Sequence, residues 1–238
     1  MANFFLKAAK KVLKTEADAL RKLKDDLPSD FSDLVKLILN LTGRVIVSGV
    51  GKSGHIGNKI AATLASTGTP AYFVHATEAS HGDLGMITEQ DLCLLISNSG
   101  ETIEMFNILN HARRFSIPIA TMSSNCESTL VKAANFKLCL PMADEACPIG
   151  MAPTTSTTMM LALGDALAVA LMEAKSFNAE NFKIFHPGGK LGAKLMTVSQ
   201  LMHKDDTMPL VKADTSMRET LLTMSTKGFG IAAIVDEI

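Results

Sequence analysis

The stretch Val45-Ile46-Val47-Ser48-Gly49-Val50-Gly51-Lys52-Ser53-Gly54 decides the fold. Its first six residues form an apolar run that is typical of a buried strand, and the glycines that follow permit a sharp turn. Residues 56–66 then show helical spacing. A strand, a glycine turn and a helix in this order predict one unit of a parallel α/β sheet. Free N–H groups at the start of such a helix can hold an anion.

The same alternation continues along the chain. Short apolar or β-branched runs predict strands at residues 45–50, 71–75, 92–97, 117–122 and 136–140. Stretches with helical spacing predict helices at residues 56–66, 101–115 and 155–175. Strands that are buried on both faces and separated by helices predict an α/β fold, a parallel sheet between two helical layers. Two amphipathic helices within residues 3–41 precede the sheet. The residue pattern changes again near residue 197, where we expect a domain boundary.

Composition excludes several classes of protein. The 238 residues carry 23 Lys and Arg against 24 Asp and Glu, so the chain lacks the basic surface of a protein that wraps duplex DNA. An aromatic content of 5% without Trp argues against base-stacking platforms. The longest stretch without a charged side chain, residues 146–164, holds Pro148 and Pro153, which argues against a membrane span. The four cysteines show no CxxC spacing, and we expect them to be reduced in a cytosolic protein.

The glycine turn allows more than one interpretation. As GxGxxG it would bind the pyrophosphate of a dinucleotide, with Glu78 at a suitable distance for a ribose contact. As a P-loop it fails, because that pattern needs glycine where Ile46 stands. Alternatively, the glycines bind no ligand and only permit a tight turn between strand and helix.

A second loop, Ser97-Asn98-Ser99-Gly100-Glu101-Thr102, follows another predicted strand and opens a helix. Three hydroxyl groups beside free helix N–H groups indicate an uncharged phosphate site. The alternative is ordinary N-capping by Ser99, but capping needs only one hydroxyl. Since a dinucleotide enzyme has no use for this second loop, the pair of loops weakens the dinucleotide interpretation.

These residues resemble the sugar isomerase (SIS) domain, whose phosphate loop reads Ser-x-Ser-Gly-x-Thr, and within it the family of arabinose 5-phosphate isomerases. The resemblance runs from about residue 40 to 196 and is carried by residues 51–57, 80–85, 97–102, 145–148, 152–154 and 186–189. It implies a flavodoxin-like three-layer αβα sandwich with a five-stranded parallel sheet, in a domain that spans residues 1–197. It also implies a cytoplasmic homotetramer that interconverts ribulose 5-phosphate and arabinose 5-phosphate through an enediol, without a cofactor. In Gram-negative bacteria that product feeds the synthesis of Kdo, a lipopolysaccharide sugar.

The tail resembles a different module. Leu201-Met202, residues 209–214, 221–224 and 234–236 look like the opening of a CBS module, of which residues 198–238 would be an incomplete copy. Because the similarity covers only part of the module, no regulatory ligand can be inferred from it.

The resemblance also implies roles for individual residues. Four side chains would carry the proton transfers of the enediol route: Lys52, Glu104, Glu145 and His186. Glu145 is the leading base, because a carboxylate in a partly apolar site would have a raised pKa. Residues that would contact the substrate are Gly51, Ser53, His81, Ser97, Asn98, Ser99 and Thr102, and His81 could also bind an inhibitory zinc ion.

Three other functions stay open at this point. A phosphoheptose or hexulose phosphate isomerase would share the fold, but Lys52 and the His186 loop favour the pentose enzyme. A sugar-phosphate sensor without activity would need a basic helix-turn-helix, whereas the N-terminal helices carry mixed charge and join through Pro28. A dinucleotide oxidoreductase would reveal itself by the absorbance of its bound cofactor. We expect a sugar phosphate and further copies of the chain as partners, and neither nucleic acid nor membrane.

Overall fold

A computed structural model describes residues 2–186 and 198–236 and confirms the predicted α/β fold. The chain divides into two compact units between His186 and Pro187, ahead of the predicted boundary at residue 197. Each unit is considered by itself, because their relative placement is not determined.

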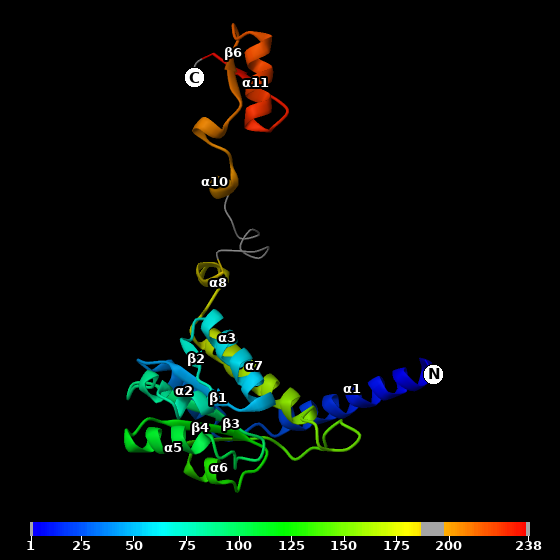
Figure 1. Cartoon of the computed structure of the whole chain (residues 1–238), viewed down its shortest axis with the longest axis vertical. Coiled ribbons are helices and arrows are strands. Elements are labelled where there is room, and N and C mark those ends of the chain that lie inside the picture. Colours follow the sequence, from blue (N-terminus) through cyan, green and yellow to red (C-terminus); the bar gives the residue numbers. More distant parts are fainter. Residues whose placement is uncertain (1, 187–197, 237–238) are drawn as a thin grey trace. The chain divides into compact units, whose positions relative to one another are not determined.

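The first unit contains one sheet of five parallel strands in the order β2-β1-β3-β4-β5 (Figure 1). The strands are β1 (Val45–Gly49), β2 (Ala71–Phe73), β3 (Leu92–Ile96), β4 (Ile119–Ser123) and β5 (Phe136–Cys139). The helices are α1 (Ala2–Asp25), α2 (Phe31–Leu39), α3 (Gly51–Ser66), α4 (Ala76–Ala79), α5 (Met105–Arg114), α6 (Thr129–Ala133), α7 (Thr155–Ala174) and α8 (Ala179–Phe185), with a 3-10 turn at Asp83–Met86.

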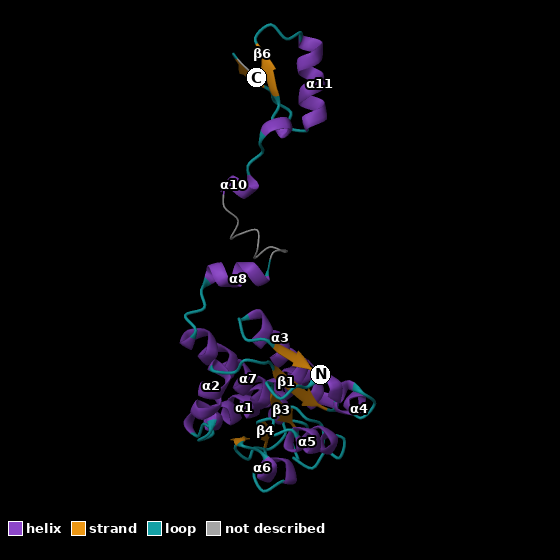
Figure 2. Cartoon of the chain, turned by 90° about the vertical axis from the view of Figure 1, so that its left-hand side faces the viewer, coloured by secondary structure: helices purple, strands orange, loops and turns teal. Residues whose placement is uncertain are grey.

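The central strands are apolar on both faces, as the sequence pattern predicts. Along β3, Leu92, Leu94 and Ile96 join a core that α1, α2, α3 and α7 cover. Cys93 and Leu95 point to the other face, where α4, α5 and α6 pack. Successive side chains of a strand point to opposite faces, so this alternation places a helical layer on each side of the sheet (Figure 2).

Helix α7 lies side by side with α3 in this core (Figure 1). It is the one helix within residues 2–186 and 198–236 that is long and apolar enough to cross a membrane. Half of its apolar segment is buried against the rest of the unit, which is how the core helix of a globular unit behaves.

One sequence prediction about a helix needs correction, and α1 is buried over only part of its length. The helix expected over residues 101–115 begins only at Met105, because the amides of Gly100 and Glu101 bond to serine side chains in the preceding loop. The face of α1 that holds Ala19 and Leu23 is buried, but Phe5 at its other end is 63% exposed. That end of α1 extends beyond the core of its own unit (Figure 1).

The prediction of four reduced cysteines is wrong for one pair. Cys126 and Cys139 form a disulfide, with 5.6 Å between their Cα atoms, whereas Cys93 and Cys147 are free. The pairing has no sequence motif, because it depends on the loop after β4 meeting the last residue of β5.

The second unit contains α10 (Val198–Leu201), a 3-10 turn (Asp205–Thr207), β6 (Leu210–Lys212), α11 (Met217–Lys227) and β7 (Ala233–Val235). The parallel strands β6 and β7 are joined through α11. Ser216 caps α11 together with Glu219, and Gly228 ends it in the left-handed conformation. The CBS assignment of these residues stays a prediction.

A buried carboxylate ties the starts of β1 and β3 together. Asp91 is fully buried and accepts hydrogen bonds from the Arg44 amide (2.7 Å), the Arg44 Nη2 (3.2 Å) and the Thr88 amide (2.8 Å). Burial raises the pKa of Asp91, but the bonds from Arg44 and Thr88 outweigh it and hold that pKa below its ordinary value.

We expect Asp91→Asn to lower the free energy of unfolding by about 1.5–3 kcal/mol at pH 7, because it weakens the hydrogen bonds that this buried carboxylate accepts from Arg44 and Thr88. A carboxyl whose folded pKa is depressed stabilises the protein above its unfolded pKa of ~3.9 and loses that contribution as pH falls through the folded value. Urea denaturation at pH 7 and below pH 4 should therefore show the difference between variant and wild type shrink in acid. The exposed Asp33→Asn change is the control and should cost under about 0.5 kcal/mol; an equal loss in both variants contradicts the role of Asp91.

Candidate active site

The two predicted anion loops meet where the strand order reverses. The chain runs from β1 to β2 on one side and then returns to β3 on the other side, so β1 lies between them. Gly49 and Ile96, the last residues of β1 and β3, are register partners. Ligands of open parallel sheets bind at the carboxyl ends of strands at such a reversal. The turn at Gly51 and the loop that begins at Ser97 therefore share the expected binding edge.

The glycines of the first loop bring α3 close to the end of β1. A Cβ on Gly54 would lie 2.8 Å from the Gly49 oxygen, and a Cβ on Gly49 would lie 3.0 Å from the Gly54 nitrogen. Gly51 has a φ of +58° and open space around it. These contacts hold the first-turn N–H groups of α3, beside Lys52, at the carboxyl edge of the sheet.

The hydroxyl groups of the second loop, residues 97–102, divide into two roles. The buried Ser97 hydroxyl pairs with the Thr102 hydroxyl (2.8 Å) and accepts from the Gly100 amide (3.0 Å), so these groups shape the loop. The exposed Ser99 hydroxyl accepts from the Glu101 amide (3.2 Å) and keeps its own hydrogen to donate. Asn98 beside it is exposed too. The Ser99 hydroxyl and the Asn98 Nδ2 group are therefore the donors of this loop that are free to reach a ligand, since Asn98 Oδ1 already accepts from Ser124.

A neighbouring segment that the sequence analysis missed supports this loop. Gly100 has a φ of +67°, and a Cβ there would lie 1.9 Å from the Ser128 hydroxyl. The Leu130 amide donates to the Gly100 oxygen (3.2 Å), and the Thr129 amide donates to the Glu101 carboxylate (2.7 Å). The N-capping pattern at Ser128 is a sequence signal for α6, but its packing against Gly100 is a tertiary contact that no local pattern reveals.

Glu104 lies at the same edge. It is the N-cap of α5, and the next residue, Met105, is buried with its sulfur 3.9 Å from the Ser48 hydroxyl of β1. Glu104 and Lys52 are both exposed, and neither side chain makes a hydrogen bond or an ion pair to another described residue. Their charged groups are available to a ligand at the ends of β1 and β3.

Glu145 reaches this edge through the start of α7, but its predicted raised pKa is wrong. Its carboxylate accepts from the amides of Thr154 (2.7 Å) and Ser156 (3.3 Å) and from both of their hydroxyls. Burial raises the pKa of Glu145, yet these four hydrogen bonds outweigh it and lower that pKa below the ordinary value. The apolar residues around position 145 suggested desolvation, whereas the donors come from residues nine and eleven positions later.

Ser53 and His81 were both predicted to contact the substrate, and each lies beside other residues of this chain. The partly buried Ser53 hydroxyl lies 3.9 Å from the Met160 sulfur, a contact that joins α3 to α7. The exposed His81 follows α4, whose end is fixed by a 2.7 Å hydrogen bond from Asn107 of α5 to Ser80. Within the described part of the chain, no three His, Cys, Asp or Glu side chains gather as a metal site, so zinc at His81 stays a prediction.

His186 is not brought to this edge. The preceding residue, Phe185, lines a cavity of about 310 Å³ with Gly68 and Pro70, which lead into the first residue of β2. His186 itself stacks on Phe182 and bonds through Nδ1 to the Phe182 oxygen (2.9 Å). These contacts place it at the amino-terminal edge of the sheet, away from the Ser97 loop. The rest of its predicted motif, residues 187–189, lies outside the described residues.

Comparisons with known proteins agree with this geometry. Residues 38–170 match the SIS domain family. The chain is 51% identical to the arabinose 5-phosphate isomerase KdsD of Yersinia pestis, over 98% of this chain and 71% of that protein. It is 48% identical to the KdsD of Pseudomonas aeruginosa, over 98% of this chain and 72% of that protein. A protein of E. coli CFT073 solved in complex with arabinose 5-phosphate superimposes with a TM-score of 0.76 at 39% identity, over 79% of this chain and 100% of the other. The chain belongs to the SIS domain family and, within it, to the arabinose 5-phosphate isomerases.

Proposed function

We propose that this chain interconverts D-ribulose 5-phosphate and D-arabinose 5-phosphate through an enediol intermediate. The observation that carries the proposal is that the Lys52 turn and the Ser97 loop follow register-paired strand ends at the strand-order reversal, which supports a phosphate site beside acid–base groups. The relatives named as arabinose 5-phosphate isomerases, and the similar structure that holds arabinose 5-phosphate, support this substrate. In Gram-negative cells the product would supply Kdo for lipopolysaccharide.

Residues of the two loops bind the phosphate in this proposal. Ser99 and Asn98 donate from the second loop, while N–H groups of the first turn of α3 approach from the other strand end. Ser97 and Thr102 act indirectly, because their hydroxyls already hold the loop in shape. Uncharged donors suit a phosphate that must leave again after each turnover.

Glu104 is our candidate for the base that moves the proton between C1 and C2. Its carboxylate accepts no hydrogen bond from any described residue, so its lone pairs are free. Glu145 keeps its carboxylate occupied by Thr154 and Ser156, and we assign it to positioning the start of α7. Lys52 stabilises the negative oxygen of the enediolate, and His81 lines the sugar chain.

A second copy of the chain supplies His186 in this proposal. Within one chain His186 lies at the wrong edge of the sheet, while the exposed residues Phe4, Phe5, Leu6 and Leu13 give α1 an apolar surface. Apolar surface of this kind marks a site of protein association. We therefore infer a homo-oligomer, with four copies implied by the family.

The enediol route needs no cofactor, since it moves protons only. We propose a cytoplasmic location and no nucleic-acid or membrane partner, in line with the balanced charge of the chain. Residues 198–238 stay our candidate for an incomplete CBS module, without an assigned ligand.

Deuterium exchange tests the proposed function. The purified chain, incubated with ribulose 5-phosphate in D₂O, should form arabinose 5-phosphate with deuterium at C2. Glu104→Gln should lower kcat by about 10²–10⁴-fold, because a placed base contributes that much. Ser99→Ala should raise KM by about 10- to 100-fold with kcat little changed, because it removes a donor to a charged phosphate.

Several outcomes oppose this assignment. Product that is still free of deuterium after many reversible turnovers in D₂O would indicate a direct hydride shift in place of an enediol. If Glu104→Gln keeps a normal kcat while Glu145→Gln folds but is inactive, the base is Glu145 and not Glu104. Absorbance of a nicotinamide or flavin in the purified chain, with no turnover of ribulose 5-phosphate, would favour the dinucleotide interpretation.

A further inference from the structure

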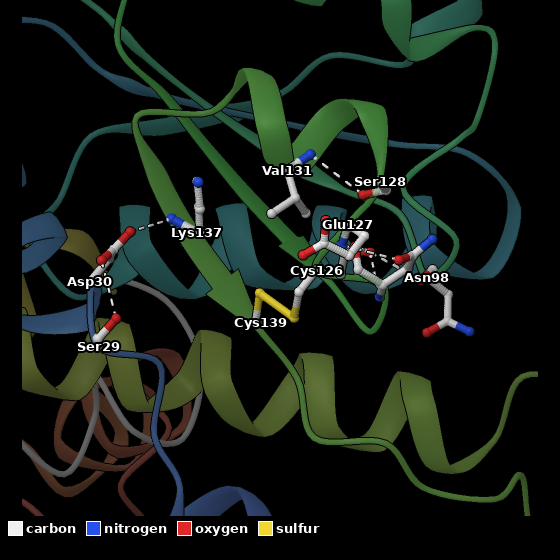
Figure 3. Close-up of a disulfide and its surroundings, with 11 residues drawn as sticks. Ser29, Asp30, Asn98, Cys126, Glu127, Ser128, Val131, Lys137 and Cys139 are labelled. Atoms are coloured by element: carbon white, nitrogen blue, oxygen red, sulfur yellow. Dashed lines mark hydrogen bonds between the residues drawn. A yellow bond between two sulfur atoms is a disulfide. The ribbon is translucent and has the colours of Figure 1, made fainter.

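The disulfide lies next to the phosphate loop, outside the catalytic groups discussed so far. Cys126 is in the loop between β4 and α6, and Cys139 is the last residue of β5 (Figure 3). Both therefore lie at the carboxyl edge of the sheet, where the Ser97 loop is found.

The segment that carries Cys126 touches the phosphate loop on both sides of the cysteine. Before it, the Ser124 amide donates to the Asn98 oxygen (3.2 Å) and the Ser124 hydroxyl donates to Asn98 Oδ1 (2.8 Å). After it, Ser128 is buried in the space beside Gly100. Any movement of the Cys126 loop must displace Asn98 or Gly100.

The other end of the disulfide is held firmly. β5 pairs with β4, and its Lys137 amide donates to Asp30 Oδ2 (2.8 Å) ahead of α2 (Figure 3). The Leu140 amide, one residue after Cys139, donates to the Ser123 oxygen (2.8 Å). Cys126, in contrast, makes no backbone hydrogen bond to another described residue. The disulfide thus ties a loop to a fixed strand.

Cys126 and Cys139 are also accessible to thiol–disulfide exchange. Cys126 is exposed and Cys139 is half-buried, with 5.6 Å between their Cα atoms, inside the ordinary range for a disulfide. Disulfides in reducing compartments are usually transient or redox-sensing, so a pair placed here in a cytoplasmic enzyme calls for a role beyond structure.

We propose that Cys126 and Cys139 form a reversible thiol–disulfide switch that sets the affinity of the phosphate loop. The oxidant is a low-molecular-weight disulfide, RSSR. The Cys126 thiolate attacks one sulfur of RSSR and releases RSH after protonation; the Cys139 thiolate then attacks the Cys126 sulfur and releases the second RSH. Two electrons pass from the two cysteines to RSSR, and excess thiol reverses both steps.

The oxidised form binds phosphate more tightly, because the disulfide restricts the loop that positions Asn98 and Gly100 before the ligand arrives. Reduction releases Cys126, and we expect KM for ribulose 5-phosphate to rise by about 5-fold or more, the low end of ordinary coupling between two sites, with kcat little changed. Coupling between binding equilibria is reciprocal, so saturating arabinose 5-phosphate should raise the equilibrium constant for forming the disulfide by the factor by which oxidation lowers the Kd for arabinose 5-phosphate.

The test equilibrates the full chain with mixtures of oxidised and reduced glutathione. Alkylation and mass spectrometry give the oxidised fraction with and without arabinose 5-phosphate, and steady-state kinetics give KM and kcat for each form. The control is the double variant Cys126→Ser, Cys139→Ser, which keeps Cys93 and Cys147. It should show one KM at every glutathione ratio, near that of the reduced wild type.

Three results overturn the switch: no disulfide at any glutathione ratio, equal KM in both redox forms, or a redox response that persists in the double variant. The proposal rests on the phosphate role of the Ser97 loop, and calorimetry with inorganic phosphate separates the two claims. A chain that turns over no ribulose 5-phosphate in either form counts against the proposed isomerase. Equal affinity of the two forms for inorganic phosphate counts against the switch.

Discussion

Mixed oligomers of Lys52→Ala and His186→Ala chains should recover about a quarter of wild-type activity, although each variant alone loses about 10²–10⁴-fold in kcat. Lys52 lies at the turn beside the phosphate loop of its own chain, whereas His186 lies at the other edge of the sheet. If each site takes Lys52 from one chain and His186 from a second, random pairing gives about one site in four with both natural residues.

The measurement needs both variants in the same oligomer. Co-expression with two different tags and purification through both tags in turn would provide it, followed by the ribulose 5-phosphate assay. Pairing Lys52→Ala with Glu104→Gln is the matched control, because both positions lie at the same edge of one chain and should not complement. Mixed oligomers of Lys52→Ala and His186→Ala that stay inactive would show that one chain supplies both residues.

Replacing Gly100 by alanine should raise KM for ribulose 5-phosphate by about 100-fold. The new Cβ would lie 1.9 Å from the Ser128 hydroxyl, so either Ser128 or the phosphate loop must move by about 1 Å, a misplacement that can cost about 10²-fold. Steady-state kinetics, with circular dichroism to confirm the fold, would measure the effect.

Gly228→Ala is the control, because it puts alanine at a glycine of positive φ where the new Cβ meets no atom. Gly228 has a φ of +75°, close to the +67° of Gly100, but a Cβ there meets nothing within 4 Å. It ends α11 in the second unit, so its replacement should leave KM unchanged. Equal KM values for both alanine variants would mean that the Gly100 loop does not bind the phosphate.

The strands and the two loops at their ends could be predicted because their signals are local. An apolar run such as residues 45–50 is confined to a few positions, and hydroxyls such as Ser99 lie next to the strand that positions them. Parallel strands also end at a common edge, so the two loops could be expected to face one ligand. For that reason the fold and the binding edge were accessible without coordinates.

The features that sequence reasoning missed depend on tertiary contacts. Glu145 was expected in an apolar setting, but Thr154 and Ser156 fold back to saturate its carboxylate. The Cys126–Cys139 disulfide joins two chain segments without a spacing motif. The position of His186 follows from how α8 sets Phe185 beside Gly68 and Pro70 ahead of β2, which local patterns do not specify.

The close contact between Gly49 and Gly54 limits how this enzyme can be redesigned. Any side chain at either position would force α3 away from the end of β1 and withdraw its amide groups from the ligand. Engineers who want room for a longer sugar ester must therefore leave that corner untouched. His81 lies outside that corner and is exposed, so a substitution there meets no such backbone contact.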